Sequence, residues 1–426
     1  MWTERPLAEL ATITSGGTPS RDVEAFWDGE IPWVTPTDIS ACDTNVLSQT
    51  KERISRRGLS ASSARLVPAG SILLTSRATV GEARIAGLAV STNQGFKSLT
   101  ATAAMDSRFL FYQVQRCRGL FERYAAGSTF VEIGKRDTSR IPIAHPIDVE
   151  QQRRIATILV GIDNAIESTE ALIAKHQLIK TGLMYDLFTR GIGADGRIRP
   201  TTDSVHTKFG AIPAQWRLGS ILELTDRDRQ AILTGPFGAD LGSGDFVEEG
   251  VPVLRIGNVQ AGRLDIEDLL HVAPRKAELL ARYRVKEGDL LFARQGATTG
   301  RNALADDRVS GSLINYHIIR VALDHRRCAP LFVEAAFNCE VIKRQIERDK
   351  GRGTREGINT AQIVSLEFPI ADVEEQRRIS AVLTAQNNRI ESERAVLASL
   401  RMQKAGLMQD LLTGKVRVPL AETASA

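Results

Sequence analysis

Several short motifs in this sequence have the form of catalytic sites, but the residues around them argue against that chemistry. Residues 240–244 (DLGSG) match the acidic-x-Gly-x-Gly loop of enzymes that bind S-adenosylmethionine. Such a loop follows a buried strand and opens a helix, whereas here it follows residues 235–238 (GPFG), which are typical of a turn. The sequence also lacks an Asn-Pro-Pro-Tyr or Asp-Pro-Pro-Tyr segment that could clamp a flipped adenine. We therefore expect no methyltransferase site.

Phosphate, metal and hydrolytic chemistry lack a pattern as well. Residues 127–135 contain two glycines and a lysine, but six residues separate the glycines. Arg136 also stands where a phosphate loop has the Ser or Thr that binds magnesium. The six histidines show no metal-ligand spacing, and no Glu-x-Lys pair matches those that hold a metal in many nucleases. We expect no catalytic residues and no metal site in this chain.

The composition is that of an ordinary soluble protein from a reducing compartment. Hydrophobic residues make up 42% and charged residues 25% of the 426 residues. No apolar run is long enough to cross a bilayer, and the start lacks a secretory pattern. The four cysteines are widely spaced, without a Cys-x-x-Cys pair. We expect a cytoplasmic protein without a membrane partner.

The basic residues favour nucleic acid as a partner. The net charge is +4, and before residue 148 the only lysines are Lys51, Lys97 and Lys135, while arginines are numerous. Arginine forms bidentate hydrogen bonds with guanine edges and phosphates. Composition alone also fits many arginine-rich enzymes, so the partner stays open at this point.

A long segment occurs twice, and this repeat organises the chain. Residues 152–189 align without a gap onto residues 376–413, with 18 of 38 positions identical. In both copies apolar residues recur at alternating steps of four and three, which is typical of a helix that packs along one seam against a partner helix. The seam residues of the first copy are Ile155, Leu159, Ile162, Ile166, Thr169, Ile173, His176, Lys180, Leu183 and Leu187. Those of the second copy are Ile379, Leu383, Gln386, Ile390, Glu393, Leu397, Leu400, Lys404, Leu407 and Leu411.

Each repeated helix would be a rod of roughly 57 Å, at about 1.5 Å per residue. Two such seams in one chain are most simply buried against each other, and because each helix follows its own globular segment, the pair would run antiparallel. Gly182 and Gly406 interrupt helix propensity at matching places. They are either tolerated glycines or places where another chain approaches closely.

The globular segments before the two helices are also weakly alike. Residues 29–34 match 250–254, residues 68–74 match 286–292, and residues 78–81 match 297–300. In the first segment we expect strands at 31–34, 71–75 and 86–91 and a helix at 108–124. The predicted domains are a first head at 1–148, a helix at 149–190, a connector without periodic pattern at 191–212, a second head at 213–370, a second helix at 371–415 and a tail at 416–426. The expected fold class is α+β, with two mixed α/β heads separated by two long antiparallel helices that form a coiled coil, as a pseudo-two-fold repeat.

In this arrangement the chain resembles the specificity subunit of type I restriction-modification systems. The resemblance covers nearly the whole chain and is carried by residues 146–155 (PIDVEQQRRI), 369–379 (PIADVEEQRRI) and 212–216 (IPAQW), together with the Gly-x-Ile/Leu-Leu strands of both heads. The first copy has Gln151 where the second has Glu375, a difference from which we expect little consequence.

The resemblance implies a function without catalysis by this chain. Each head would be a target recognition domain that reads one half of a split, asymmetric site in double-stranded DNA. The helices would set the separation of the half-sites and dock two modification subunits, which carry adenine methyltransferase activity, and restriction subunits, which translocate DNA and cut it, would join them. S-adenosylmethionine, ATP and Mg would be bound by those partners and not by this chain. The host would be a prokaryote.

Candidate DNA-binding residues lie in the polar loops in which the two heads differ. In the first head they are Arg21, Arg77, Asn93, Gln94, Lys97 and Arg136. In the second head they are Arg255, Asn258, Arg294, Gln295, Arg301, Asn315, Tyr316, Arg352 and Arg355. Each of these could instead be a solvated charge or an amide that stabilises its own loop. The alternative function is a helical scaffold that does not bind DNA, or an inhibitor that docks on such complexes.

Overall fold

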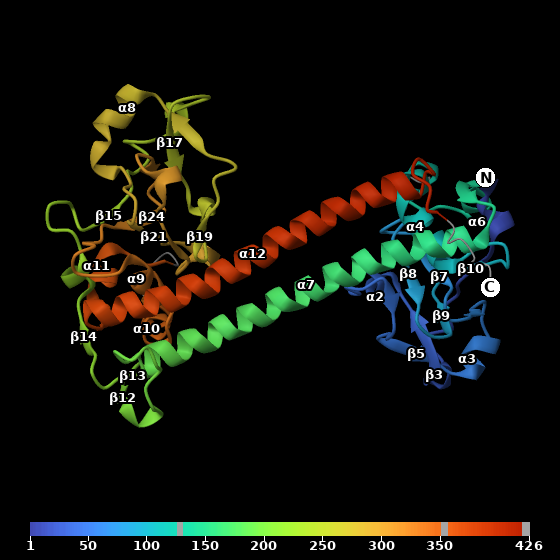
Figure 1. Cartoon of the computed structure of the whole chain (residues 1–426), viewed down its shortest axis with the longest axis horizontal. Coiled ribbons are helices and arrows are strands. Elements are labelled where there is room, and N and C mark those ends of the chain that lie inside the picture. The colour runs from blue at the N-terminus through green and yellow to red at the C-terminus, as the bar shows by residue number, and fades with distance from the viewer. Residues whose placement is uncertain (126–130, 351–356, 420–426) are drawn as a thin grey trace, which may run out of the picture. The chain divides into compact units, whose positions relative to one another are not determined.

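The computed structural model describes residues 1–125, 131–350 and 357–419. They form two compact units (Figure 1). The first unit comprises Met1–Leu172 with Glu393–Ala426, and the second comprises Ile173–Ser392. Each unit therefore contains one head and a part of each long helix.

The first head contains two sheets and a flanking strand pair. The five-stranded sheet has the order β2 (Ala11–Ser15), β10 (Phe96–Ala101), β7 (Ile72–Thr75), β8 (Ala83–Ala86) and β4 (Val46–Leu47). The four-stranded sheet has the order β5 (Glu52–Ile54), β3 (Trp27–Val34), β9 (Val90–Thr92) and β6 (Leu66–Val67). Strand β1 (Trp2–Pro6) pairs with β11 (Pro142–Pro146). The helices of this head are α1 (Leu7–Leu10), α2 (Pro36–Ser40), α3 (Arg56–Ser60), α4 (Ser107–Arg116), α5 (Arg118–Tyr124) and α6 (Lys135–Arg140).

The second head repeats this plan with its own insertions. One four-stranded sheet has the order β15 (Ile232–Thr234), β24 (Ile318–Val321), β21 (Leu290–Ala293) and β22 (Asn302–Leu304). The other has the order β16 (Phe246–Val247), β20 (Leu270–Val272), β17 (Val251–Leu254) and β23 (Leu313–Ile314). The two-stranded sheets are β14 (Arg217–Gly219) with β25 (Phe368–Ile370), β12 (Ser204–Thr207) with β13 (Gly210–Pro213), and β18 (Val259–Gln260) with β19 (Arg263–Leu264). The helices are α8 (Pro274–Leu279), α9 (Pro330–Phe337), α10 (Glu340–Lys350) and α11 (Thr360–Ser365).

The two long helices are α7 (Val149–Thr189) and α12 (Val373–Leu411). Each begins after an aspartate whose side chain caps the first turn: Asp148 Oδ1 accepts from the N–H of Glu150, and Asp372 Oδ1 accepts from that of Glu374, both at 2.9 Å. Gly191 follows the end of α7 in a left-handed conformation, with φ of 71°. The sequence thus supplies start signals at matching places in both helices and a stop signal after α7.

In each unit the two helices lie side by side and run antiparallel, as predicted (Figure 1). In the first unit the early part of α7 meets the late part of α12, where Lys404 Nζ lies 2.6 Å from Asp163 Oδ1. In the second unit the late part of α7 meets the early part of α12, where Gln386 Nε2 donates to the carbonyl oxygen of His176 at 2.8 Å. Every predicted seam residue is buried or half-buried, which confirms the seam.

A buried glutamine joins each helix to its head. Gln152 donates to the carbonyl of Pro146 at 2.8 Å and accepts from the N–H of Asp106 at 2.7 Å. Gln376 makes the same two contacts, with Ala371 at 2.9 Å and Ala329 at 3.0 Å. Both glutamines are fully buried, so the repeated Gln-Arg-Arg-Ile segment fixes the start of the helix on the head.

The neighbouring position corrects the expectation that the difference between Gln151 and Glu375 has little consequence. Glu375 is buried and accepts two hydrogen bonds from Arg199, at 2.7 and 2.8 Å, and one from the N–H of Ile192 at 2.9 Å. These partners lie in the segment that follows α7. A neutral Gln151 could not balance a buried guanidinium, so this ion pair is particular to the second unit.

Three local predictions need correction. Residues 86–91 are not one strand, because β8 ends at Ala86 and the chain turns at Gly87 toward β9 in the other sheet. The helix predicted over 108–124 is divided at Cys117 into α4 and α5. Residues 191–212, for which no regular structure was predicted, contain β12 and most of β13, which form a hairpin. Hydrogen bonds with segments distant in sequence determine the break after Ala86, whereas pairing between neighbouring residues forms the hairpin of β12 and β13.

Candidate nucleic-acid interface

In each head, four loop segments meet where two antiparallel strands of one sheet end. Thr75 of β7 is opposite Phe96 of β10, and Ala293 of β21 is opposite Ile318 of β24. We call the resulting surfaces the first tip and the second tip. The first tip consists of residues 16–18, 76–81, 93–95 and 131–136, and the second tip of residues 235–238, 294–300, 315–317 and 357–358.

The same backbone hydrogen bonds hold both tips. In the first tip, Ser76 N donates to the carbonyl of Gly95 at 2.7 Å and its own carbonyl accepts from Ile133 N at 3.0 Å. In the second tip, Arg294 N donates to the carbonyl of His317 at 3.1 Å and its own carbonyl accepts from Ile358 N at 2.9 Å. The residues that form these bonds therefore occupy equivalent places: Ser76 and Arg294, Gly95 and His317, and Ile133 and Ile358.

A glycine is required at the same place in both tips. A Cβ atom on Gly16 would lie 1.9 Å from the carbonyl oxygen of Asn93, and one on Gly235 would lie 2.2 Å from that of Asn315. No side chain fits such a contact, so the two glycines keep the tip segments in close contact.

Two predicted basic residues at or next to the first tip, Arg77 and Lys97, are already paired with Glu132 within the head. Arg77 Nε lies 2.8 Å from Glu132, and Lys97 Nζ lies 3.5 Å from Glu132 and 3.2 Å from Ser76 Oγ. Lys97 is buried, and desolvation lowers its pKa. Lys97 therefore stabilises the tip from inside the head, while Arg77 is about half exposed and lies at the surface.

The polar groups of the first tip that face solvent are an amide and a short basic helix. Gln94 is exposed, and its side-chain oxygen accepts from the hydroxyl of Thr18. Asn93 accepts from the N–H of Gly95 at 2.8 Å and so shapes the turn. Arg136 is exposed on α6, and the contacts found among the described residues include no ion pair for it. Gln94 and Arg136 are thus the predicted residues best placed to contact a ligand.

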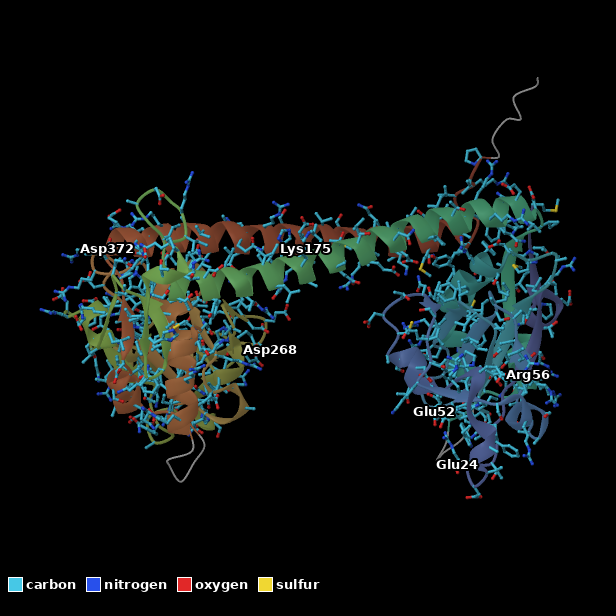
Figure 2. The ribbon with its side chains drawn as sticks, turned by 90° about the horizontal axis from the view of Figure 1, so that it is seen from below. Glu24, Glu52, Arg56, Lys175, Asp268 and Asp372 are labelled. Atoms are coloured by element: carbon cyan, nitrogen blue, oxygen red, sulfur yellow. The ribbon has the colours of Figure 1, made fainter. Side chains whose placement is uncertain are left out.

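Arg21 lies apart from these groups. Its guanidinium binds Glu52 of β5 at 2.5 and 3.0 Å and stacks 3.8 Å from the ring centroid of Trp27. The hydrogen bond with Glu52 raises the pKa of Arg21. Figure 2 shows Glu52, with Glu24 and Arg56, on the part of the first head that lies away from α7.

In the second tip the predicted residues bind other residues of the same tip. Arg294 donates to the carbonyls of Ile358 at 3.2 Å and Tyr316 at 3.0 Å, and burial lowers its pKa. The side chain of Gln295 contacts His317 Nδ1, and burial lowers the pKa of that imidazole. Through these contacts Arg294 stabilises the loop, and the rings of Tyr316 and His317 remain at the surface of the tip.

Asn315 and Tyr316 complete the second tip. Asn315 Oδ1 accepts from the N–H of His317 at 3.1 Å, which closes the turn. The ring of Tyr316 lies 3.7 Å from that of His317 between centroids. The rings of Tyr316 and His317 therefore pack against each other, and the polar groups of the loop hold them in place.

The remaining predicted residues of the second head lie outside the tip. Asn258 is buried, where it accepts from Arg255 N and donates to the carbonyl of Asp265. Arg255 donates to the carbonyl of Asp268, which is labelled in Figure 2, at 2.9 Å. Arg301 is exposed and donates to Gln260 Oε1 at 3.0 Å. Arg352 and Arg355 lie outside the described residues.

Two tip residues escaped prediction from the sequence, Thr18 and Phe237. They occupy equivalent places, two residues after the required glycines Gly16 and Gly235. Each contacts the residue after the tip asparagine, which is Gln94 in the first tip and Tyr316 in the second. The available signal was the glycine-rich turn that precedes each of them, which the sequence indicates only as a turn.

Comparison with known proteins decides the family. The sequence model described as "Type I restriction modification DNA specificity domain" matches residues 1–175 and 218–402. The chain belongs to this family. Each matched segment contains one head and most of the long helix after it, so the family unit occurs twice, as the repeat in the sequence indicates.

Similar members of the specificity family include two from Methanocaldococcus jannaschii. The chain is 31% identical over 169 residues to the type I restriction enzyme MjaIX specificity subunit, a match that spans 39% of each chain. It is 23% identical over 350 residues to the MjaVIII specificity subunit, which covers 82% of this chain and 79% of that one. Matches to individual relatives thus range from about two fifths to about four fifths of their length.

Solved structures show the same fold. The S subunit of a type I restriction-modification system from M. genitalium aligns with a TM-score of 0.60 at 14% identity, over 99% of this chain and 97% of that one. A chain from a structure of the assembly and conformational transition of a type I system aligns with a TM-score of 0.57 at 16% identity, over 97% and 98%. Among the described residues no helix has the length and apolar character needed to cross a membrane. The same residues contain no group of three or more His, Cys, Asp or Glu side chains placed to hold a metal.

Proposed function

We propose that this chain is the sequence-reading subunit of a type I restriction-modification complex. Each head binds one half of an asymmetric, split site in double-stranded DNA through its tip. The chain carries out no chemistry, and adenine methylation belongs to two modification subunits, with restriction subunits joining them. S-adenosylmethionine, ATP and Mg²⁺ are bound by those partners.

One observation carries the proposal: the two tips share a backbone and differ in side chains. The matched hydrogen bonds of Ser76 and Arg294 place Gln94 and Tyr316 at equivalent points. A frame that keeps its backbone and varies its exposed side chains suits a surface that discriminates between ligands of one class. Because base pairs present different donor and acceptor patterns on a common duplex geometry, DNA is such a ligand.

The long helices offer the same exposed surface twice, which supports docking of two identical partners. Leu178 on α7 and Met402 on α12 are equivalent positions of the repeat and are 74% and 72% exposed. One helical turn further on lie Gly182 and Gly406, and a Cβ atom built on either meets no heavy atom within 4 Å among the described residues. The chain itself thus gives no packing reason for these glycines, although each costs about 1 kcal/mol of helix stability relative to alanine.

The experiment combines the chain with its modification subunits and maps methylated adenines on genomic DNA. Expected is methylation at one asymmetric site with two defined half-sites, spaced by about one helical turn or roughly 34–36 Å. Omitting this chain, or omitting the modification subunits, should abolish methylation. Exchange of residues 1–148 for the head of a relative should alter one half-site and leave the other unchanged.

Two outcomes would reject the proposal. Methyl transfer by the chain alone would contradict a role without catalysis. Assembly with the modification subunits that leaves the methylated sites unchanged, or blocks methylation, would favour the alternative of a scaffold or inhibitor that does not read DNA.

A further inference from the structure

Phe237 is the exposed aromatic residue of the second tip. The residue is 62% exposed, which leaves a large apolar surface in contact with water for a residue held in a tight loop. The face of its ring stacks on Tyr316, with 6.1 Å between centroids and 28° between planes. Tyr316 in turn lies against His317. Phe237 is therefore the outermost of three rings that pack in a row, followed by Tyr316 and His317.

The backbone of Phe237 is fixed as well. Its carbonyl accepts from Asp240 N at 2.8 Å and from Leu241 N at 3.0 Å, and Leu241 is buried. On the other side, Gly235 N donates to the carbonyl of Ile318 at 3.2 Å. The ring is thus presented to solvent by a rigid turn, so little conformational freedom remains to be lost when it binds.

The equivalent residue of the first tip has the opposite chemistry. Thr18 stands at the place of Phe237, and Gln94 at the place of Tyr316. A hydroxyl and an amide can donate to and accept from the polar edges of bases. Two stacked rings cannot do so through their faces, but they can bury an apolar group.

We infer that Phe237 recognises a thymine in the half-site of the second head, by packing its ring against the 5-methyl group. This inference rests on the proposed function. The thymine methyl is the one apolar group that base pairs display in the major groove, and aromatic or aliphatic side chains contact it there. The exposed face of Phe237, supported from behind by Tyr316, provides a surface for that methyl group.

The test uses the complex of this chain with its modification subunits and duplexes in which single thymines are replaced by deoxyuridine, which lacks only the methyl group. Wild-type complex should bind about fourfold more weakly when one thymine of the second half-site is replaced, as expected for the loss of one buried methyl group. The Phe237→Ala complex should bind the thymine and deoxyuridine duplexes equally at that position. Phe237→Leu, which keeps an apolar surface, should retain part of the preference.

Thr18→Ala provides the matched control, since it alters the equivalent place in the first tip. It should leave the preference for thymine in the second half-site unchanged. Assembly of each variant with the modification subunits, measured by size-exclusion chromatography, shows that the variant has folded.

Several results would overturn the inference while the proposed function stands. These are a second half-site without thymine on either strand, no response to deoxyuridine there, or an undiminished preference in Phe237→Ala. If Phe237→Ala weakened binding to the thymine duplex and to the deoxyuridine duplex by the same factor, the preference for thymine would remain. That result would indicate that Phe237 inserts between base pairs as a wedge, and it also contradicts recognition of the methyl group. A wild-type complex without any preferred DNA site would instead reject the proposed function itself.

Discussion

At the first tip the amide of Gln94 contacts the hydroxyl of Thr18, and at the second tip the equivalent places hold Tyr316 and Phe237. The carbonyls and N–H groups behind these side chains are bonded in the same way in both heads. The scaffold therefore fixes where the side chains stand and leaves their chemistry free. Because the backbone does not depend on which residue occupies the tip, each head can change its ligand without changing its fold.

The interiors of the two heads differ as well, and there the difference concerns charge. At the start of β7, the end of this strand opposite the first tip, Ser71 shares a hydrogen bond with Thr100 at 2.9 Å between hydroxyl oxygens. At the equivalent place the second head has Asp289, which lies 2.8 Å from Arg229 and 3.9 Å from Arg320. The first head thus uses a neutral pair where the second buries an aspartate and two arginines.

Breaking these two interior contacts should give the largest difference between the heads. Asp289→Ala leaves two largely buried guanidiniums without their carboxylate and should lower the free energy of unfolding of the second unit by about 3–5 kcal/mol. Ser71→Ala removes one neutral hydrogen bond and should cost about 1 kcal/mol in the first unit. Chemical denaturation of both variants and the parent, followed by circular dichroism, measures the two costs. Equal costs would show that the buried charges contribute no more than the hydroxyl pair.

A second contrast involves Glu334, which is buried in α9 at the place that Phe111 occupies in α4. Burial raises the pKa of Glu334 from 4.5 to about 7, and the charge of Lys180 opposes this rise. Below pH 4.5 the carboxyl is neutral in both the folded and the unfolded chain, so folding carries no penalty. Between pH 4.5 and about 7 the unfolded chain releases the proton first, and the second unit should lose about 3 kcal/mol of stability.

Glu334→Gln should remove this pH dependence. The variant is expected to be more stable than the parent by about 3 kcal/mol at pH 7.5, and equally stable at pH 4. Thermal unfolding at both pH values measures the gain. Glu249→Gln, at an exposed position, is the control and should change stability by less than about 0.5 kcal/mol. A gain that persists at pH 4 would mean that packing, and not ionisation, distinguishes the two residues.

The two tips should also differ in which half-site they discriminate, with a smaller change in free energy. Gln94→Ala removes an exposed amide and should reduce discrimination at one base pair of the first half-site by about 1–3 kcal/mol, without effect on the second half-site. Competition binding with duplexes altered in one half-site at a time measures this. Asn258→Ala serves as the contrast, because that amide is buried and bonded to its own loop. It should lower stability and leave the ranking of DNA sequences unchanged.

The sequence predicts the frame of the molecule better than its tips. The spacing of Leu159 or Leu383 within a regular seam is a local pattern, and a local pattern is sufficient to predict a helix and the face it buries. The antiparallel pairing and the repeated heads follow from the same repeat. The fold class was therefore predictable without knowledge of any contact.

The role of a polar residue depends on contacts that sequence spacing does not reveal. Arg294 and Arg301 stand in one loop, yet the first donates to two carbonyls of other segments and the second faces solvent. The same holds for Glu375, whose partner Arg199 is 176 residues away. Phe237 escaped prediction because the turn pattern of residues 235–238 does not reveal whether its ring is exposed, and only the fold places it beside Tyr316.

The smallest effect compares the two copies of the long helix. Gly182→Ala and Gly406→Ala should each stabilise the chain by about 1 kcal/mol, since alanine favours a helix interior and the new Cβ meets nothing within 4 Å among the described residues. If these glycines accept the close approach of a modification subunit, the same substitutions should weaken assembly with that subunit. Thermal unfolding of the isolated chain and titration calorimetry with the modification subunit give the two quantities.

A gain in the stability of the isolated chain together with a loss of affinity for the modification subunit distinguishes an effect on docking from an effect on folding. A single substitution should weaken one of the two modification-subunit sites, and the double substitution should weaken both, because Gly182 and Gly406 stand at equivalent points of separate copies. Ala385→Ser, at an exposed position of α12 that lies 21 residues before Gly406, is the control for a small change outside the proposed contact. Stabilisation with unchanged assembly would show that both glycines are merely tolerated. In that case Leu178 and Met402 would have to form the docking surface without a close approach of the backbone.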